Sequence, residues 1–397
     1  MSFMKSDTLR RAMARLRPGA LPGSGGAGNQ TDAAEYVRQT LARHGLAGDA
    51  APRDGADPAG ASSAARRSQS GQSQSGQSQG GAQAGSFGPL SDLMSGSLSN
   101  MLSGAMSGLM PDGQGSDAGL ATHTEPAGAR DYLLHVPESL NDAPPEGLVL
   151  MLHGCTQTPR DFAAGTAMNA LADQHRLIVV YPAQARGANA QSCWNWFSRG
   201  DQQRDRGEPS ILAGMVRAVA AEHDVPEGRI YVAGLSAGAA MAVILGETYP
   251  EVFAAVGAHS GLPYAAARDV PQAFAAMRGE LGARKSDTAR PVPTIVFHGS
   301  ADGTVAPSNG ARIHTDALGA APGAQLQTET SGTSGGRSFR RTSTTDDTGA
   351  VLAEYWQIEG LGHAWSGGDR AGTYTDAAGP DASAEMIRFF QSVTAKA

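Results

Sequence analysis

The chain has 397 residues, 40% of them apolar, and a formal net charge of −7 from 31 Lys and Arg against 38 Asp and Glu. This acidic balance excludes a nucleic-acid-binding protein, because affinity for phosphates comes from clustered basic side chains. No uncharged apolar run approaches the ~18 residues that a membrane-spanning helix needs, so we expect no transmembrane segment.

Residues 1–124 are predicted to be a largely disordered, low-complexity region. Gly, Ser, Ala and Gln dominate it, and residues 68–86 nearly repeat Ser-Gly-Gln-Ser-Gln. Such a composition buries too little apolar surface to offset about 1–2 kcal/mol of backbone entropy per residue. Helical spacing of apolar residues predicts short amphipathic helices at about 32–46 and 90–110, the second with a Leu/Met stripe opposite Ser and Gly.

The N-terminus is basic, but no apolar stretch of signal-peptide length follows. The sequence therefore contains no readable export signal and leaves the compartment open. It also contains two cysteines, Cys155 and Cys193, which are too few for a disulfide scaffold and lack metal-ligand spacing, although one bridge between them remains open.

From residue 125 to 397 apolar runs of strand length alternate with helical patterns, which indicates one domain built from βαβ units around a mostly parallel sheet. The predicted strands are 132–136, 148–153, 177–181, 229–233, 256–259, 294–298 and 352–358, and the predicted helices are 162–175, 210–223, 237–249 and 382–395.

Ser236 is the candidate nucleophile. It is the central residue of Gly234-Leu235-Ser236-Ala237-Gly238, which matches the G-x-S-x-G pattern of a sharp strand-to-helix turn. The bare pattern is weak, since it also occurs around Ser78 in the repeat and around Ser334 in a Ser/Thr-rich loop. Only Ser236 follows a strand-like run and precedes a helix-like one.

A serine nucleophile needs a base, and the base needs a carboxylate to hold its tautomer. In α/β-hydrolases the order along the chain is Ser, acid, His, with both partners on loops after strands. Asp302 follows the predicted strand 294–298, and His363 follows the last one in a Gly-rich loop. The alternatives are Asp269 or Asp376 as the acid and His298, His259, His314, His175 or His223 as the base.

The tetrahedral intermediate needs hydrogen-bond donors aimed at its oxyanion. The N–H of Ala237, directly after the nucleophile, is the first candidate. The second comes from the loop after an early strand, where Cys155 N–H is suitably placed. We interpret His153 in this loop as structural rather than catalytic, holding the loop through hydrogen bonds of its ring.

With these motifs the sequence resembles the esterase family of poly(3-hydroxybutyrate) (PHB) depolymerases and the related feruloyl and acetylxylan esterases. The resemblance covers about residues 130–394 and rests on five motifs in order: Leu152 to Gln157, Ser192 to Phe197, Tyr231 to Met241, Phe297 to Val305, and Gly360 to Gly368. It implies an α/β-hydrolase fold, with a mostly parallel central sheet and helices on both faces, and Ser236, Asp302 and His363 as a catalytic triad.

The resemblance also implies further roles. It suggests that Cys155 and Cys193 pair beside the oxyanion loop, against the alternative of two reduced thiols. Trp194, Trp196 and Trp365 would line the acyl site, although plain core packing is an alternative for Trp196. The implied activity is serine esterase hydrolysis of 3-hydroxybutyrate polymer or oligomers, with no metal or organic cofactor.

Feruloyl or acetyl esters of polysaccharide are the alternative substrates, and a non-catalytic granule-associated protein that keeps the fold is the alternative of another class. Family members are typically exported and carry a polymer-binding domain. We expect the stripe at 90–110 either to adsorb to an apolar granule in place of that domain, to cover an apolar surface of the chain itself, or to be disordered.

Overall fold

The computed structural model describes residues 119–280, 292–319 and 325–393. The helices expected at about 32–46 and 90–110, and with them the granule-binding hypothesis, lie outside these residues. The described fold begins with strand β1 (Ala121–Glu125), ahead of the boundary expected at residue 125. No helix in this part of the chain is long and apolar enough to cross a membrane.

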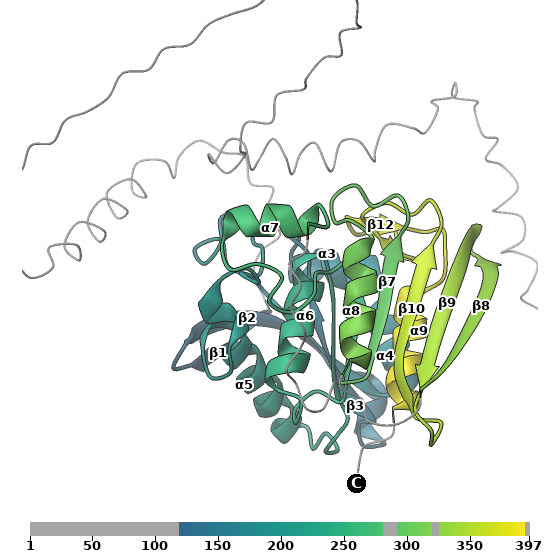
Figure 1. Ribbon diagram of the computed structural model, residues 1–397. Helices are drawn as coiled ribbons and strands as arrows, with labels where there is room; N and C mark the ends of the chain where they lie inside the picture. The colour runs from purple at the N-terminus through teal and green to yellow at the C-terminus, as the bar shows by residue number, and fades with distance from the viewer. Residues whose placement is uncertain (1–118, 281–291, 320–324, 394–397) are drawn as a thin grey trace, which may run out of the picture. The chain divides into compact units, whose positions relative to one another are not determined.

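A central sheet organises the described residues (Figure 1). Its strand order is β1-β2-β4-β3-β5-β6-β7-β10-β9-β8. The strands from β4 to β10 in this order pair in parallel, and antiparallel strands extend the sheet at both edges. Beyond β1, the strands are β2 (Gly128–His135), β3 (Gly147–Leu152), β4 (Leu177–Pro182), β5 (Ile230–Leu235), β6 (Ala255–His259), β7 (Thr294–Gly299), β8 (Leu326–Ser334), β9 (Arg337–Thr345) and β10 (Val351–Ile358).

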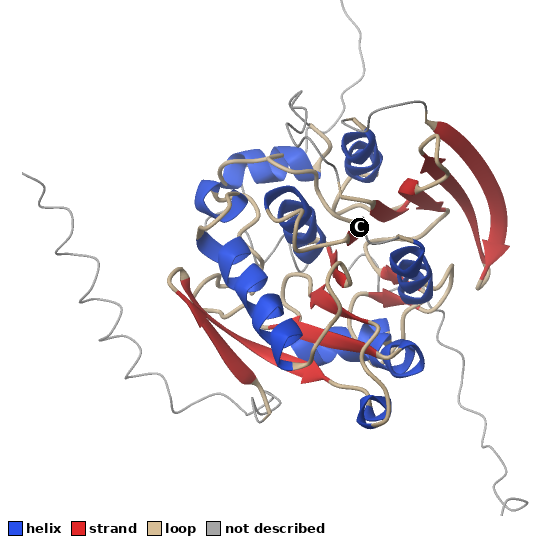
Figure 2. Ribbon diagram, turned by 90° about the horizontal axis from the view of Figure 1, so that it is seen from below, coloured by secondary structure: helices blue, strands red, loops and turns tan. Residues whose placement is uncertain are grey.

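Helices cover both faces of this sheet, as the view in Figure 2 shows. They are α3 (Pro159–Thr166), α4 (Met168–His175), α5 (Gly207–Glu222), α6 (Ala237–Thr248), α7 (Val270–Met277), α8 (Ser308–Leu318) and α9 (Ala382–Ser392), with short 3-10 turns η1 (Glu138–Asn141) and η2 (Arg199–Gln202). Because the parallel strands are buried on both faces, they are mostly apolar rather than alternating, although β10 also carries Glu354 and Gln357. Leu148, Leu150 and Leu152 of β3 pack with α5 and α6, whereas Val149 and Met151 pack with α3, α4 and α9.

The expected α/β fold with a mostly parallel sheet is confirmed, while two local expectations are wrong. The helix expected at 162–175 is two helices, because Ala167 adopts a left-handed conformation (φ 50°, ψ 22°) that ends α3 and starts α4. The region around Ser334, expected as a loop, is the antiparallel hairpin of β8 and β9, which turns at Gly335 and Gly336, both with positive φ.

Candidate active site

Ser236 lies in the sharp turn between β5 and α6. Its backbone (φ 58°, ψ −118°) is in a region that non-glycine residues rarely adopt, and such strain concentrates at functional sites. The turn requires small neighbours, since a Cβ on Gly238 would lie 2.0 Å from the carbonyl oxygen of Leu152. The N–H of Ser236 donates to the carbonyl of His259 at 2.9 Å, which ties the turn to the end of β6. Ser334, in contrast, lies at the exposed end of hairpin strand β8.

Asp302 lies in the loop after β7 and is 6% exposed. One carboxylate oxygen, Oδ1, accepts the backbone N–H groups of Thr304 (3.0 Å) and Val305 (2.9 Å), and Oδ2 accepts Nδ1–H of His363 at 2.8 Å. Burial alone would raise the pKa of Asp302. The charge of His363 and hydrogen bonds from His298 and His363 outweigh burial and hold this pKa well below its usual value. Asp302 is therefore an ionised carboxylate, pre-oriented towards the histidine.

His363 follows β10, in a loop that is bound to the acid loop by its backbone. Gly360 N–H donates to Ser300 Oγ at 2.9 Å, and Ala301 N–H donates to the carbonyl of Leu361 at 3.0 Å. Since Nδ1 donates to Asp302, the lone pair of Nε2 is available to a proton from a nucleophile. Within the described residues, however, no hydrogen bond joins His363 Nε2 to Ser236 Oγ.

The rival acids and the rival base His298 have other partners. Asp269 caps the N-terminus of α7 by accepting Gln272 N–H, and Asp376 forms an ion pair with Arg337. His298 lies closer to the site: its Nε2 donates to the carbonyl of Val305 at 2.9 Å and lies 3.5 Å from Asp302 Oδ2. It therefore supports the acid loop rather than the nucleophile.

The loop after β3 brings one candidate oxyanion donor, Cys155 N–H, beside the nucleophile, and the other, Ala237 N–H, begins α6. A Cβ placed on Gly154 would lie 3.7 Å from Cβ of Ser236, so the backbone of this loop passes beside the serine. Cys155 N–H donates no hydrogen bond within the part of the chain that the structure describes. Ala237 is the first residue of α6, where backbone N–H groups have no partner one turn back. Both donors are free to serve a ligand.

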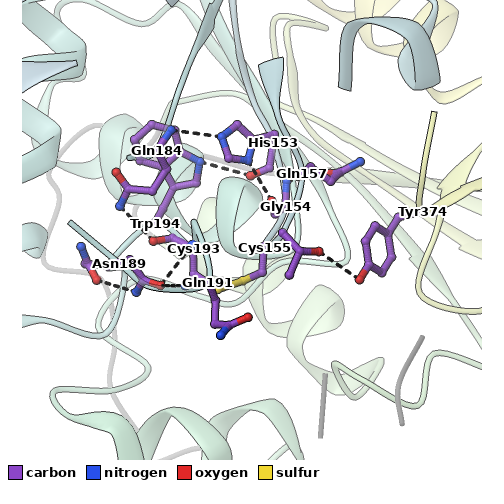
Figure 3. The surroundings of a disulfide bond; sticks show 12 residues. His153, Gly154, Cys155, Gln157, Gln184, Asn189, Gln191, Cys193, Trp194 and Tyr374 are labelled. Atoms are coloured by element: carbon purple, nitrogen blue, oxygen red, sulfur yellow. Dashed lines mark hydrogen bonds between the residues drawn. A yellow bond between two sulfur atoms is a disulfide. The ribbon is translucent and has the colours of Figure 1, made fainter. Parts of the chain in front are cut away.

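His153 orients the peptide that carries the Cys155 N–H (Figure 3). Its Nδ1–H donates to the carbonyl of Gly154 at 2.8 Å, and its Nε2 accepts Gln184 N–H at 3.2 Å. In a trans peptide the C=O and N–H point in opposite directions, so holding the Gly154 oxygen also directs the Cys155 N–H. Burial lowers the pKa of His153 to about 4, against the opposing effects of its bond to Gly154 and the charge of Asp161. The ring is thus neutral and structural.

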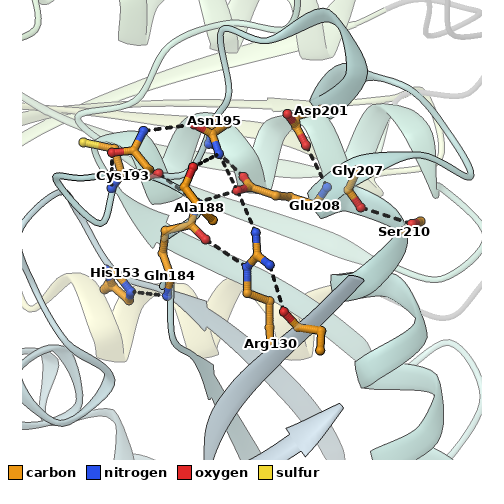
Figure 4. Close-up of polar contacts among 12 residues, drawn as sticks. Arg130, His153, Gln184, Ala188, Cys193, Asn195, Asp201, Gly207, Glu208 and Ser210 are labelled. Atoms are coloured by element: carbon orange, nitrogen blue, oxygen red, sulfur yellow. Dashed lines mark hydrogen bonds and ion pairs between the residues drawn. The ribbon is translucent and has the colours of Figure 1, made fainter. Parts of the chain in front are cut away.

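A disulfide joins Cys155 to Cys193, with the two Cα atoms 4.2 Å apart. The chain around Cys193 is held by the buried carboxylate of Glu208 at the start of α5 (Figure 4). Glu208 accepts Asn195 N–H at 2.7 Å, the side-chain amides of Asn195 and Gln184, and a guanidinium N–H of Arg130. Gln184 in turn donates to the carbonyl of Cys193 at 2.9 Å. Burial and the nearby charge of Asp201 raise the pKa of Glu208, while these hydrogen bonds oppose the rise.

The loop between β11 (Trp365–Ser366) and β12 (Thr375–Asp376), residues 367–374, fastens the other side of the oxyanion loop. Gln157 accepts Gly154 N–H at 2.9 Å and donates to the carbonyl of Thr373 at 3.0 Å. Asp161 accepts both the N–H (2.9 Å) and the hydroxyl (2.6 Å) of Thr373, and Tyr374 lies 3.2 Å from the hydroxyl of Thr156. The segment after His363 and the oxyanion loop therefore form one hydrogen-bonded unit.

The three tryptophans expected at the acyl site are all buried. Trp194 donates its indole N–H to the carbonyl of His153, and Trp365 donates to Ser383 and packs edge-on against Phe162. Trp196 is 6% exposed and packs in the cluster between the sheet and α5 and α6. Their contact with an acyl group stays a prediction.

The sequence did not predict the residues whose side chains and backbone hold the oxyanion loop in place. Glu208 and Thr373 act on the oxyanion loop through contacts across long sequence separations, and Gln157 links Thr373 to Gly154, three residues before it. The one local indication in the sequence is Glu208 itself. It is a carboxylate in the first turn of a largely apolar helix, α5, and it is buried there.

The chain resembles known esterases over much of its described part. Residues 131–324 match the family model described as Esterase PHB depolymerase. Poly(3-hydroxyalkanoate) depolymerase C of Paucimonas lemoignei is 37% identical over 241 residues, 58% of this chain and 57% of that protein. Feruloyl esterase B of Neurospora crassa is 32% identical over 143 residues, 36% of this chain and 47% of that protein. The chain thus spans about half the length of these curated relatives.

The fold agrees with these matches. The acetyl xylan esterase from Aspergillus awamori superposes with a TM-score of 0.52 at 19% identity, covering 70% of this chain and 100% of that one. Sheet order, ordered motifs and family model therefore point the same way, and the match includes Ser236 and Asp302, while His363 lies beyond it. Residues 131–324, just under half of the chain, match the esterase PHB depolymerase family, and the curated relatives are named as a depolymerase and as esterases.

Proposed function

We propose that the chain is a serine carboxylic-ester hydrolase that acts through Ser236, His363 and Asp302. The observation that carries this proposal is the 2.8 Å hydrogen bond between Asp302 and His363 at the same end of the sheet as the strained turn of Ser236. An ionised, buried carboxylate fixes the tautomer of the imidazole, so Nε2 is the free base.

In the proposed reaction His363 takes the proton of Ser236 Oγ as this oxygen attacks the ester carbonyl. The N–H groups of Cys155 and Ala237 bind the resulting oxyanion, each contributing roughly 3 kcal/mol of transition-state stabilisation. The imidazolium then protonates the departing alcohol, which leaves an acyl-serine. Water, deprotonated by the same histidine, hydrolyses the acyl-serine and restores the free hydroxyl.

We infer that 3-hydroxyalkanoate esters, as polymer or oligomer, are the substrates. The support is the identity to a protein named poly(3-hydroxyalkanoate) depolymerase, which extends over more of this chain than the similarity to feruloyl esterase B. Feruloyl or acetyl esters of polysaccharide are the second candidate, because proteins with those names match the same region.

The test compares the full chain with Ser236→Ala and with Ser334→Ala, which alters the serine of the other G-x-S-x-G pattern within the described residues. Substrates are p-nitrophenyl esters from acetyl to dodecanoyl, 3-hydroxybutyrate oligomers and methyl ferulate. We expect Ser236→Ala to lose turnover on every ester and Ser334→Ala to keep it. Equal rates in parent and Ser236→Ala would refute the proposed nucleophile, absence of turnover in the parent would favour the non-catalytic alternative, and preference for ferulate would refute the substrate class.

A further inference from the structure

His259, the last residue of β6, contacts the backbone of two triad segments. Its carbonyl accepts Ser236 N–H at 2.9 Å, and its ring Nε2 accepts the N–H of Ser366 at 3.1 Å, shortly after His363 in sequence. His259 and Ser366 are both fully buried. One side chain and its own peptide thus connect the turn of the nucleophile to the loop of the base.

The hydrogen bonds define the state of this ring. The backbone N–H of Ser366 can only donate, so Nε2 carries the lone pair and the proton resides on Nδ1, 3.2 Å from Ser260 Oγ. Burial, together with the neighbouring His298 and His363, lowers the pKa of His259 to about 3, and only Asp302 opposes this. The ring is therefore neutral and an acceptor near neutral pH.

Aromatic packing fixes the ring in place. It stacks on Trp365, with the ring centroids 5.2 Å apart, and on Phe297, with the centroids 5.7 Å apart. Trp365 is itself immobilised by Phe162 and by its bond to Ser383. Ser260, directly after His259, has a positive φ of 53° and donates its N–H to the carbonyl of Phe297. The chain turns abruptly here while the imidazole stays inside the core.

This connection matters because Ser236 and His363 share no direct hydrogen bond within the described residues. Their separation is set by the segments that carry them. Asp302 in the acid loop binds the ring of His363. Further along the chain from His363, Ser366 donates to the ring of His259, whose carbonyl accepts the N–H of Ser236.

We propose that His259 is a positioning residue, which sets the approach of the His363 imidazole to Ser236 by binding the backbone of both segments. This inference rests on the proposed function. Loss of the ring acceptor would displace the histidine loop without removing a reacting group, and a misplacement of about 1 Å can cost roughly 100-fold in rate.

Two substitutions of His259 distinguish the effect of the hydrogen-bond acceptor at Nε2 from the effect of losing the ring, because both remove the ring and only one keeps an acceptor at that position. The amide oxygen of His259→Gln reaches the position of Nε2, whereas the shorter His259→Asn reaches only that of Nδ1. His314→Asn is the matched control, because His314 is also a buried histidine stacked on an aromatic ring, Tyr355, but lies on α8 outside the triad loops.

The assay measures kcat and KM on a p-nitrophenyl ester and the rate at which a fluorophosphonate labels Ser236. In the labelling step Ser236 Oγ forms a bond to phosphorus, fluoride leaves, and the serine proton passes to His363. We expect His259→Asn to lower kcat and the labelling rate by about 10- to 100-fold with KM nearly unchanged. His259→Gln should stay within a few-fold of the parent, and His314→Asn should match it. Nitrogen-15 NMR of the unmodified chain should show His259 protonated on Nδ1.

Parental kcat in His259→Asn, equal losses in the Asn and Gln variants, or an Nε2–H tautomer in the NMR spectrum would overturn the positioning role. The NMR result decides even where a variant does not fold. The Ser236→Ala variant distinguishes a failure of the positioning role from a failure of the proposed function. An inactive Ser236→Ala beside a fully active His259→Asn refutes only the positioning role, whereas an active Ser236→Ala refutes the proposed function and the positioning role with it.

Discussion

Removal of the Cys155–Cys193 disulfide should lower the stability of the folded chain far more than its activity. The bond closes a loop with a sequence separation of 38 residues. In the chain-entropy model, closing a loop of this length removes conformational entropy from the unfolded chain and so raises the free energy of the unfolded state by about 4 kcal/mol. For a domain of this size, each kcal/mol shifts the melting temperature by about 2–4 °C, so the expected decrease is about 8–16 °C.

Activity should persist because other contacts hold the oxyanion loop. Thr156 N–H donates to the carbonyl of Gln191 at 2.7 Å, and Gln157 holds Gly154 from the other side. The Cys155→Ala/Cys193→Ala double variant also keeps the backbone N–H proposed to bind the oxyanion. At a temperature well below melting we therefore expect its kcat within a few-fold of the parent value.

The assay is calorimetric melting of the parent, the double variant and the parent treated with a phosphine reductant, with the bond verified by mass spectrometry. The reduced parent should melt with the double variant. A double variant that melts within about 2 °C of a verified oxidised parent would refute the entropic argument. Loss of turnover well below its melting temperature would instead show that the bond itself shapes the oxyanion loop.

Three further predictions concern the acid, the buried histidines and the serine turn. Asp302→Asn should lower kcat by about 10⁴-fold while leaving the fold intact, since the amide no longer selects the tautomer of the imidazole; a loss below about tenfold in steady-state kinetics would contradict this role. Burial lowers the pKa of His153 to about 4 and that of His259 to about 3, below the ordinary histidine value of 6.5. As pH falls, these two histidines therefore bind protons in the unfolded chain before they do so in the folded chain. Their neutral rings contribute fully to the free energy of unfolding above pH 6.5. This contribution is lost progressively towards pH 4, by about 1.4 kcal/mol per pH unit for each ring. Denaturant unfolding from pH 7.5 downwards measures how the free energy of unfolding changes with pH, and this slope should be shallower in His259→Gln. Equal slopes in the parent and the variant would contradict the proposed contribution of His259. Gly238→Ala should cost about 3 kcal/mol or more and abolish activity, because the new Cβ would lie 2.0 Å from a backbone oxygen, whereas Gly303→Ala, with nothing within 4 Å, should be neutral; similar melting and turnover of the two variants would show that the turn tolerates a Cβ.

The sequence predicts those parts of the molecule whose cause is local. Apolar runs mark the parallel strands, and a serine between a strand and a helix marks the turn at Ser236. Asp302 and His363 lie together as chain order led us to expect, because loops after neighbouring parallel strands meet at one edge of the sheet. Their chemical roles stay predictions.

What the sequence does not predict depends on contacts between distant segments or on weak local preferences. β8 is mostly exposed and rich in Thr and Ser, so it lacks the apolar alternation that marks a strand. The break at Ala167 interrupts an otherwise continuous helical pattern without a Gly or Pro at the break itself. His259 looks like an ordinary core histidine in sequence, since its partner Ser366 is 107 residues away.

The hydrogen bonds between Thr373 and the segment of Gln157 and Asp161 also determine when a growing chain can complete the proposed oxyanion loop. These partners are 212 to 216 residues apart, so the contacts form only after most of the described region has been synthesised. A nascent chain that already contains the serine turn still lacks the residues that secure the oxyanion loop. Segments synthesised more than 200 residues after the oxyanion loop thus complete its contacts, and a shorter nascent chain carries the proposed nucleophile without them.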